Sequence, residues 1–265
     1  MTMENAPLPH RAALLLVGHG SSRRPDASAP IRRLADRLAA EHRFARIETC
    51  FWKEPPFIGQ GLDRIAAPEI FVVPVFAAEG EFTRVIVPRE LGLTGTLTVR
   101  PDGRRIHYCR PVGTHPRVTN LILARADDLI ASERLEPNSI ALFLVGHGNK
   151  RGGGARTTVD ELAQKLDASG RYGEVRAVFL EEEPLAASWS ALTDRPNIIV
   201  LPLLMAEGQH GGHELPLLFG LPADLPDGQS VIAGTCQGRR IWFCRGIADA
   251  EALADIILDL VRETR

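Results

Sequence analysis

The chain has 265 residues, enough for two ordinary domains, and its 45% hydrophobic and 24% charged residues are typical of a globular protein. Its 31 Lys and Arg residues against 33 Asp and Glu give a net charge of -2, so no overall positive field favours nucleic acid or an anionic membrane as a partner. The longest apolar runs fall short of the roughly 20 residues that span a bilayer, and the N-terminus lacks an apolar signal core. We therefore expect a cytoplasmic protein with no nucleic-acid or membrane partner.

In the first half of the chain, short apolar segments alternate with helical patterns. Leu14 to Val17, Arg46 to Phe51 and Ile70 to Phe76 have the length and the residue types of buried strands. Between the first two, Ile31, Leu34 and Leu38 recur at helical spacing after Pro30, which suits a first helical turn.

The second half repeats this pattern. Strands are expected at Ile140 to Val145, Val175 to Leu180 and Ile198 to Leu203, and a last helix is expected around Leu253, Ile256, Ile257 and Leu260. Near-continuous apolar strands that alternate with helices predict a parallel sheet covered on both faces.

The two halves are copies of one domain. Val17-Gly18-His19-Gly20 returns as Val145-Gly146-His147-Gly148, an offset of 128 residues that then holds without a gap through Pro88 and Pro216. After a short insertion the offset becomes 135, from Cys109 to Cys244. We expect two similar doubly wound parallel-sheet domains from an internal duplication, at residues 1–137 and 138–265, with the active-site cleft between them.

Three polar segments follow strands of the second copy. His147 follows the first strand, the run Glu181-Glu182-Glu183 follows the second, and His210 follows the third. Ligands of open α/β sheets bind outside the carboxyl ends of the strands, so these groups are expected to face one crevice. Two imidazoles and a carboxylate suit Fe²⁺, Co²⁺, Ni²⁺ or Zn²⁺ better than Mg²⁺ or Ca²⁺. An ordinary loop histidine and a solvated acidic turn are the alternative interpretations.

The first copy is an internal control for these residues. It keeps His19 but has Lys53 for Glu181, Phe82 for His210, Val85 for His213 and Ile86 for Glu214. Because the equivalent position of the first copy accepts Phe, the fold does not require a histidine there. This favours a functional role for His210 over a structural one. We expect the first copy to have a degenerate metal site and the second to hold the ion.

These motifs resemble the class II tetrapyrrole chelatases. The order of strand, Gly-His-Gly, Phe179-Leu180-Glu181 before Pro184, and then Gly208-x-His210-x-x-x-Glu214-Leu-Pro is similar to the sirohydrochlorin cobaltochelatase and ferrochelatase (CbiX/SirB) group, and it covers nearly the whole chain as two fused half-domains. The resemblance implies ATP-independent insertion of Co²⁺ or Fe²⁺, or of Ni²⁺, into a sirohydrochlorin-type tetrapyrrole in cobalamin or siroheme biosynthesis.

The resemblance also implies roles for individual residues. His147 and His210 correspond to the metal-binding pair, and Glu181, with Glu182 next, is the best match for the family carboxylate. Because sirohydrochlorin-type substrates carry many carboxylates, basic side chains and motif positions are expected to bind them. These predicted substrate-binding residues are Lys150, Arg151, Arg156, His19 and Glu214.

Other features limit cofactors and partners. The four cysteines, Cys50, Cys109, Cys236 and Cys244, have no CxxC spacing, so they predict reduced structural thiols and no iron–sulfur cluster. The absence of a Walker loop predicts no nucleotide, and the absence of a Gly-x-Ser-x-Gly elbow argues against a serine hydrolase. We expect the divalent metal as substrate, the tetrapyrrole as partner, and a monomer. A non-catalytic metal or tetrapyrrole carrier is the alternative function.

Overall fold

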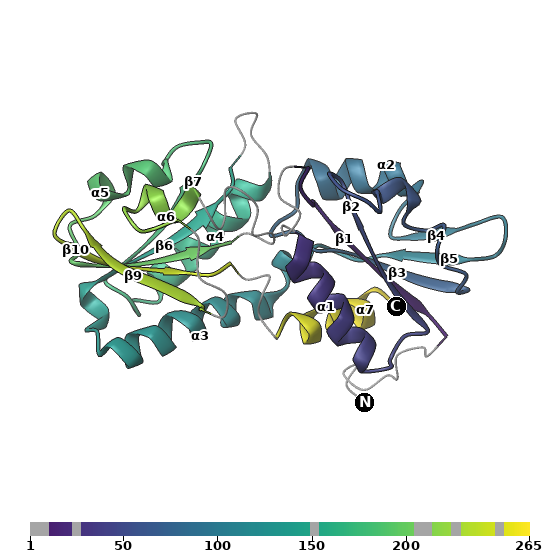
Figure 1. Cartoon of the computed structure of the whole chain (residues 1–265), viewed down its shortest axis with the longest axis horizontal. Helices are drawn as coiled ribbons and strands as arrows, with labels where there is room; N and C mark the ends of the chain where they lie inside the picture. Colours follow the sequence, from purple (N-terminus) through teal and green to yellow (C-terminus); the bar gives the residue numbers. More distant parts are fainter. Residues whose placement is uncertain (1–10, 23–27, 149–153, 204–213, 224–228, 247–251) are drawn as a thin grey trace. The chain divides into compact units, whose positions relative to one another are not determined.

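The computed structural model describes residues 11–22, 28–148, 154–203, 214–223, 229–246 and 252–265 (Figure 1). The chain forms two compact units. Unit 1 comprises residues 1–115 and 248–265, and unit 2 comprises residues 116–247.

Unit 1 is built on a five-stranded sheet in the order β2-β1-β3-β5-β4. The strands are β1 (Ala13–Gly18), β2 (Arg46–Phe51), β3 (Glu69–Pro74), β4 (Leu97–Val99) and β5 (Arg105–Tyr108). All neighbours pair in parallel except β4, which is an antiparallel edge strand on β5. The predicted parallel core is confirmed, and β4 and β5 are not among the predicted strands.

Helices cover both faces of this sheet. The helix α1 (Ala29–Ala40) begins after Ser28 with Pro30 in its first turn, as predicted, and it lies with α7 (Leu253–Thr264) on one face (Figure 1). On the other face lie the 3-10 turn η3 (Ile58–Gln60), the π-helical turn η4 (Phe82–Ile86) and α2 (Val87–Leu91). A further 3-10 turn, η5 (Val112–Thr114), follows β5.

Unit 2 repeats this architecture with the strand order β7-β6-β8-β10-β9. Its strands are β6 (Ile140–Gly146), β7 (Glu174–Phe179), β8 (Asn197–Pro202), β9 (Val231–Cys236) and β10 (Arg239–Cys244), of which β9 is the antiparallel edge. Its helices are α3 (Pro116–Glu133), α4 (Gly154–Ala168), α5 (Trp189–Leu192) and α6 (Leu215–Leu218), with 3-10 turns η6 (Pro137–Ser139) and η7 (Ala186–Ser188).

The compact units do not follow the boundary of the sequence repeat. The predicted ranges 1–137 and 138–265 separate the two copies, whereas the units divide after His115 and again near residue 247. The reason is an exchange of closing helices. The helix α3 ends the first copy but belongs to unit 2, and α7 ends the second copy but belongs to unit 1. The ranges 1–137 and 138–265 therefore describe the sequence copies and not the compact units.

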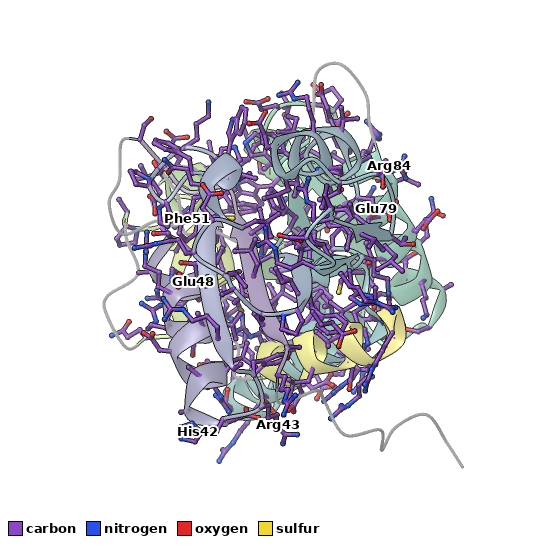
Figure 2. All side chains as sticks on the ribbon, turned by 90° about the vertical axis from the view of Figure 1, so that its right-hand side faces the viewer. His42, Arg43, Glu48, Phe51, Glu79 and Arg84 are labelled. Atoms are coloured by element: carbon purple, nitrogen blue, oxygen red, sulfur yellow. The ribbon has the colours of Figure 1, made fainter. Side chains whose placement is uncertain are left out.

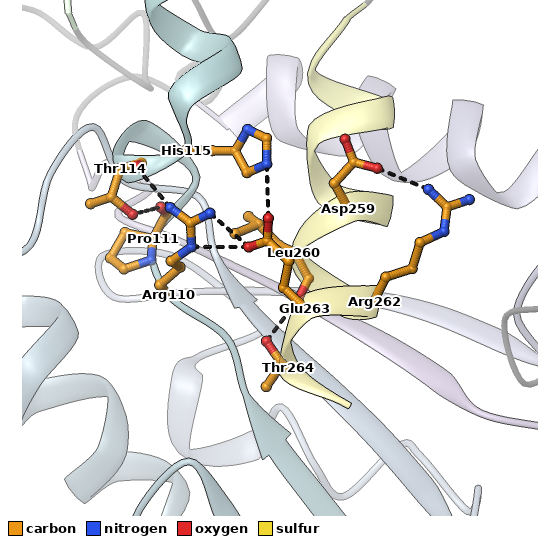
Figure 3. A network of polar contacts seen from close by, with 9 residues as sticks. All are labelled: Arg110, Pro111, Thr114, His115, Asp259, Leu260, Arg262, Glu263 and Thr264. Carbon is orange, nitrogen blue, oxygen red and sulfur yellow. Dashed lines mark hydrogen bonds and ion pairs between the residues drawn. The ribbon is translucent and has the colours of Figure 1, made fainter. Parts of the chain in front are cut away.

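Polar contacts fasten α7 to unit 1 (Figure 3). Arg110 donates from Nη2 and Nε to Oε2 of Glu263 at 2.6 and 3.2 Å, and His115 Nε2 lies 3.4 Å from Oε1 of the same carboxylate. Arg110 also donates to the carbonyl of Thr114 at 2.8 Å. Because α7 also buries Ile256, Ile257 and Leu260, both apolar packing and this polar network hold the helix on unit 1.

The equivalent helix of unit 2 is held by different groups. Arg125 of α3 donates to the carbonyl oxygens of Arg245 and Gly246 at 2.6 and 3.1 Å. Asp127 of α3 pairs with Arg171 and accepts a hydrogen bond from the Tyr172 hydroxyl at 3.2 Å. The anchors of α3 are thus an arginine on backbone carbonyls and the carboxylate of Asp127, whereas Glu263 anchors α7.

The cores of the two units are filled differently. Trp189 is 2% exposed in unit 2, donates from Nε1 to the Leu218 carbonyl at 3.1 Å and stacks on Phe219. The repeat places Gly61 at this position in unit 1, where an added Cβ would lie 2.9 Å from Sγ of Cys50. Trp242 is also buried, so Trp189 and Trp242 both have a packing role, whereas Trp52 is half-buried.

Burial also explains the chemistry of the cysteines. It raises the pKa of Cys50, Cys109 and Cys244 to about 12, as expected for structural thiols. Within the part of the chain that the structure describes, no helix is long and apolar enough to cross a membrane.

Candidate functional site

The Gly-His-Gly loops follow the central strands β1 and β6 at the carboxyl edges of the two sheets. The second glycine of each loop has a positive φ, +64° at Gly20 and +77° at Gly148, a conformation that favours glycine. A Cβ at either position would also press into the segment after the next strand, 2.8 Å from Glu54 in unit 1 and 2.9 Å from Glu182 in unit 2. Both requirements explain why the loop needs glycine there.

Backbone hydrogen bonds join the His147 loop to the segment after β7. The His147 carbonyl accepts from the amides of Leu180 and Glu181 at 3.2 and 3.1 Å. The His147 side chain is exposed, with Nδ1 3.2 Å from the Gly148 carbonyl, and Glu181 is exposed as well. The structure therefore brings the backbones of His147 and Glu181 to one edge of the sheet.

Unit 1 keeps this backbone but changes the side chains. The His19 carbonyl accepts from Trp52 and Lys53 at 3.1 and 2.9 Å, so Lys53 takes the place of Glu181 beside the histidine. The His19 ring meets Phe82 edge-on, with 5.1 Å between ring centroids. A cation and an apolar ring therefore stand where unit 2 has a carboxylate and, by sequence, a histidine.

Further aromatic rings extend this surface of unit 1. Phe82 packs against Trp52 and Phe76, each at 5.8 Å between ring centroids, and the Lys53 ammonium lies 5.6 Å from the Trp52 ring. Arg84 Nη2 forms an ion pair with Oε2 of Glu79 at 2.7 Å (both side chains are labelled in Figure 2). Aromatic rings therefore surround Phe82, and the Lys53 ammonium lies over one of them.

Several predicted site residues lie outside the described residues: His210, His213, Lys150 and Arg151. Glu214 is described, half-buried, and directly precedes α6. Among the residues that the structure describes, no group of three His, Cys, Asp or Glu side chains is placed to hold a metal ion, a set that does not contain His210. The meeting of His147 with His210 stays a prediction.

The predicted substrate-binding residue Arg156 has several partners inside unit 2. Its Nε donates to Asp160 at 3.0 Å, and its Nη1 donates to Glu182 and to the Glu183 carbonyl at 3.3 and 2.8 Å. Hydrogen bonds to Asp160 first and Glu182 second raise the pKa of this guanidinium. These contacts fix Arg156 beside the Gly-His-Gly loop.

A cavity of about 620 Å³ lies elsewhere in unit 1. Gly59, Leu91 and the turn between β4 and β5 line it, and two of its arginines pair with acids, as in Arg104–Asp102 at 2.7 Å. It contains none of the predicted site residues.

The contacts of Phe82, Arg32 and Asp160 were not predicted from the sequence. Their signal was present in the repeat, which aligns Phe82 with His210 and Arg32 with Asp160. The aligned residues differ in type, so the sequence alone does not relate Arg32 to Arg156. The structure shows that the two arginines contact equivalent residues, Glu54 in unit 1 and Glu182 in unit 2.

Two sheets of one topology, each with a Gly-His-Gly loop at its carboxyl edge, define a duplicated α/β protein of the chelatase type. The CbiX family model matches residues 13–129 and 141–264, once for each copy. The chain belongs to the CbiX family.

Known proteins agree with this assignment. A probable sirohydrochlorin cobaltochelatase of Halobacterium salinarum is 32% identical over 93% of this chain and 89% of its own length. The fold is shared with a multi-domain protein of Deinococcus radiodurans that is described as similar to chelatases (TM-score 0.74, 24% identity, 96% of this chain), although this chain spans only 55% of that one. It is also shared with the sirohydrochlorin chelatase SirB from Bacillus subtilis subspecies spizizenii, solved with cobalt (TM-score 0.67, 20% identity, 96% and 94% coverage). The predictions of fold and of a chelatase-type enzyme family are thus confirmed.

Proposed function

We propose that this protein inserts a divalent metal ion, Co²⁺ or Fe²⁺ with Ni²⁺ as a third candidate, into a sirohydrochlorin-type tetrapyrrole without ATP. In this proposal unit 2 holds the ion with His147, His210 and Glu181. The ion is a substrate that is bound and released in each turnover.

One observation carries the proposal. The two Gly-His-Gly loops have the same backbone arrangement, but the residues beside their histidines differ in charge. Glu181 donates its amide to the His147 carbonyl, and Lys53 does the same to His19. A carboxylate beside an imidazole attracts a divalent cation, whereas an ammonium repels it. The difference supports a metal site in unit 2 and none in unit 1.

The chemistry of insertion uses these residue types. The ion must lose water, two pyrrole protons must leave, and the ring must bend to expose its nitrogen lone pairs. Imidazoles bind a transition ion while still releasing it, and an imidazole near neutral pKa can accept a pyrrole proton. Glu181 compensates the charge of the ion and can carry protons away. Contacts remote from the metal offset the distortion of the ring.

The macrocycle brings many carboxylates, so its contacts are proposed to be basic. Lys150, Arg151 and His19 are the proposed contacts, with Glu214 at the acidic position of the third motif. The apolar Phe82 in unit 1 offers a flat ring a stacking partner instead of a metal ligand.

A turnover assay tests the proposal. Free-base sirohydrochlorin is mixed anaerobically with Co²⁺, Fe²⁺ or Ni²⁺, and the absorbance change is followed with protein at about a hundredth of the substrate concentration. We expect many turnovers per chain and a rate well above that of metal alone. Product formation that stops at one equivalent per chain would instead identify a carrier, and no rate above the metal-only blank would refute insertion.

A further inference from the structure

A clamp of Arg156 and Glu182 braces the His147 loop. The Glu182 side chain, 15% exposed, lies directly against Gly148, where a Cβ would come within 2.9 Å of its Cγ. Arg156 Nη1 donates to this carboxylate at 3.3 Å and to the Glu183 carbonyl at 2.8 Å. The guanidinium also lies over the Phe179 ring, 5.3 Å from its centroid.

Unit 1 contains the same clamp. Arg32 Nη2 donates to Glu54 at 3.2 Å and to the Pro55 carbonyl at 3.1 Å, and its guanidinium lies 4.7 Å from the Phe51 ring centroid. Glu54 in turn accepts from the amide of Ser21, just after the Gly-His-Gly loop, at 3.2 Å. The carboxylate therefore links the arginine to the loop that presents the histidine.

The two arginines come from different positions in the repeat. The offset of 128 aligns Glu54 with Glu182 and Phe51 with Phe179, but it aligns Arg156 with Ser28 and Arg32 with Asp160. Residues four apart share one face of a helix, so either position can place a guanidinium over the ring. The other position then supplies the partner of Nε, Ser28 at 3.1 Å in unit 1 and Asp160 at 3.0 Å in unit 2.

The two units thus make the same arginine–glutamate contact from different positions of the repeat. The residue that supplies the guanidinium differs between the two copies, while its carboxylate, carbonyl and ring partners occupy equivalent positions. The sequence position is thus replaceable, and the clamp itself is what both units retain.

We propose that Arg156 and Glu182 are positioning residues that fix the His147 loop for metal exchange, and that Arg156 does not bind the substrate. The inference rests on the proposed function, because it takes His147 as a metal ligand. A fixed loop holds the imidazole in one orientation and so lowers the cost of ordering it when the ion binds.

The test moves the arginine by one turn. In Arg156→Ser, we expect Co²⁺ affinity and kcat to fall about tenfold, as for partners that orient metal ligands, while the KM for the tetrapyrrole stays within about twofold. In Arg156→Ser/Asp160→Arg, which copies the arrangement of unit 1, we expect both values to return to within about threefold of wild type. Arg32→Ser is the matched control, with a similar loss of Tm and an unchanged Co²⁺ affinity.

The outcomes separate the possibilities. A raised KM in Arg156→Ser that the second substitution fails to restore would mean that Arg156 binds substrate, and unchanged Co²⁺ affinity would mean that the clamp does not position His147. Should Arg156→Ser fail to fold, the double variant alone decides, since activity near wild type supports the clamp and its loss overturns it. If the wild type binds Co²⁺ but shows no insertion, the proposed function fails, and the Co²⁺ affinities of the variants still test the clamp.

Discussion

The carboxyl edges of the two sheets share one scaffold and carry different chemistry. Both have a Gly-His-Gly loop with a left-handed second glycine, the same backbone hydrogen bonds and the same arginine–glutamate clamp. Unit 2 adds Glu181 beside its histidine, and unit 1 has Lys53 and the ring of Phe82. The comparison teaches which residues the fold requires and which are left for a ligand.

The largest expected effect is on metal insertion by the two histidines. We predict that His147→Ala or His210→Ala lowers the insertion rate about a thousandfold, because each removes an imidazole that binds the ion or accepts a proton. His19→Ala is predicted to cost less than about tenfold, since unit 1 has Lys53 beside its histidine where unit 2 has Glu181. Steady-state insertion assays with Co²⁺ measure both. Equal losses in the two units would show that both supply ligands.

A second prediction concerns the cores. Trp189→Ala should lower the free energy of unfolding of unit 2 by about 3 kcal/mol or more, because removing the indole ring leaves a cavity in its core. Unit 1 has Gly61 at the equivalent position and is not changed by this substitution. Hydrogen exchange should quicken in β6, β7 and β8 and stay unchanged in β1, β2 and β3. Equal changes in both sheets would mean that the units unfold as one body.

Exchanging charges sharpens the comparison of the edges. Glu181→Lys should weaken Co²⁺ binding about 10- to 100-fold, because it places an ammonium beside His147 as in unit 1. Glu181→Gln separates the loss of the ligand from the added repulsion and should have the smaller effect. Isothermal titration calorimetry measures both, and an unchanged affinity in Glu181→Lys would exclude Glu181 from the site.

The smallest effect is predicted for the anchors of the closing helices. Burial lowers the pKa of His115, which faces Glu263, Arg110 and Asp259. The folded state thus prefers the neutral imidazole, so its stability is full above the unfolded pKa of about 6.5 and falls as pH drops through that value towards the folded pKa. Tm should therefore fall slightly more in the wild type than in His115→Gln between pH 7.5 and 5.5. An identical pH dependence in both proteins would show that the pKa of His115 is the same in the folded and unfolded states.

Sequence was sufficient for the first three parallel strands of each sheet and for the repeat, because long apolar runs and a constant offset are strong signals. It missed the last two strands of each sheet. In unit 1 these are only three and four residues long, and β5 and β10 both begin with charged arginines. It also missed the exchange of α3 and α7, since an amphipathic stripe does not reveal on which of two similar sheets it packs. The arginine clamp was hidden because the alignment pairs Arg156 with Ser28.

The central claim is that the chain has one metal-binding edge, and that it lies in unit 2. Titration with Co²⁺, followed by the visible absorption of the bound ion under anaerobic conditions, tests it most directly. We predict one Co²⁺ per chain, lost in His147→Ala and retained in His19→Ala. Two equivalents per chain, or a signal that survives in His147→Ala and disappears in His19→Ala, would contradict the account.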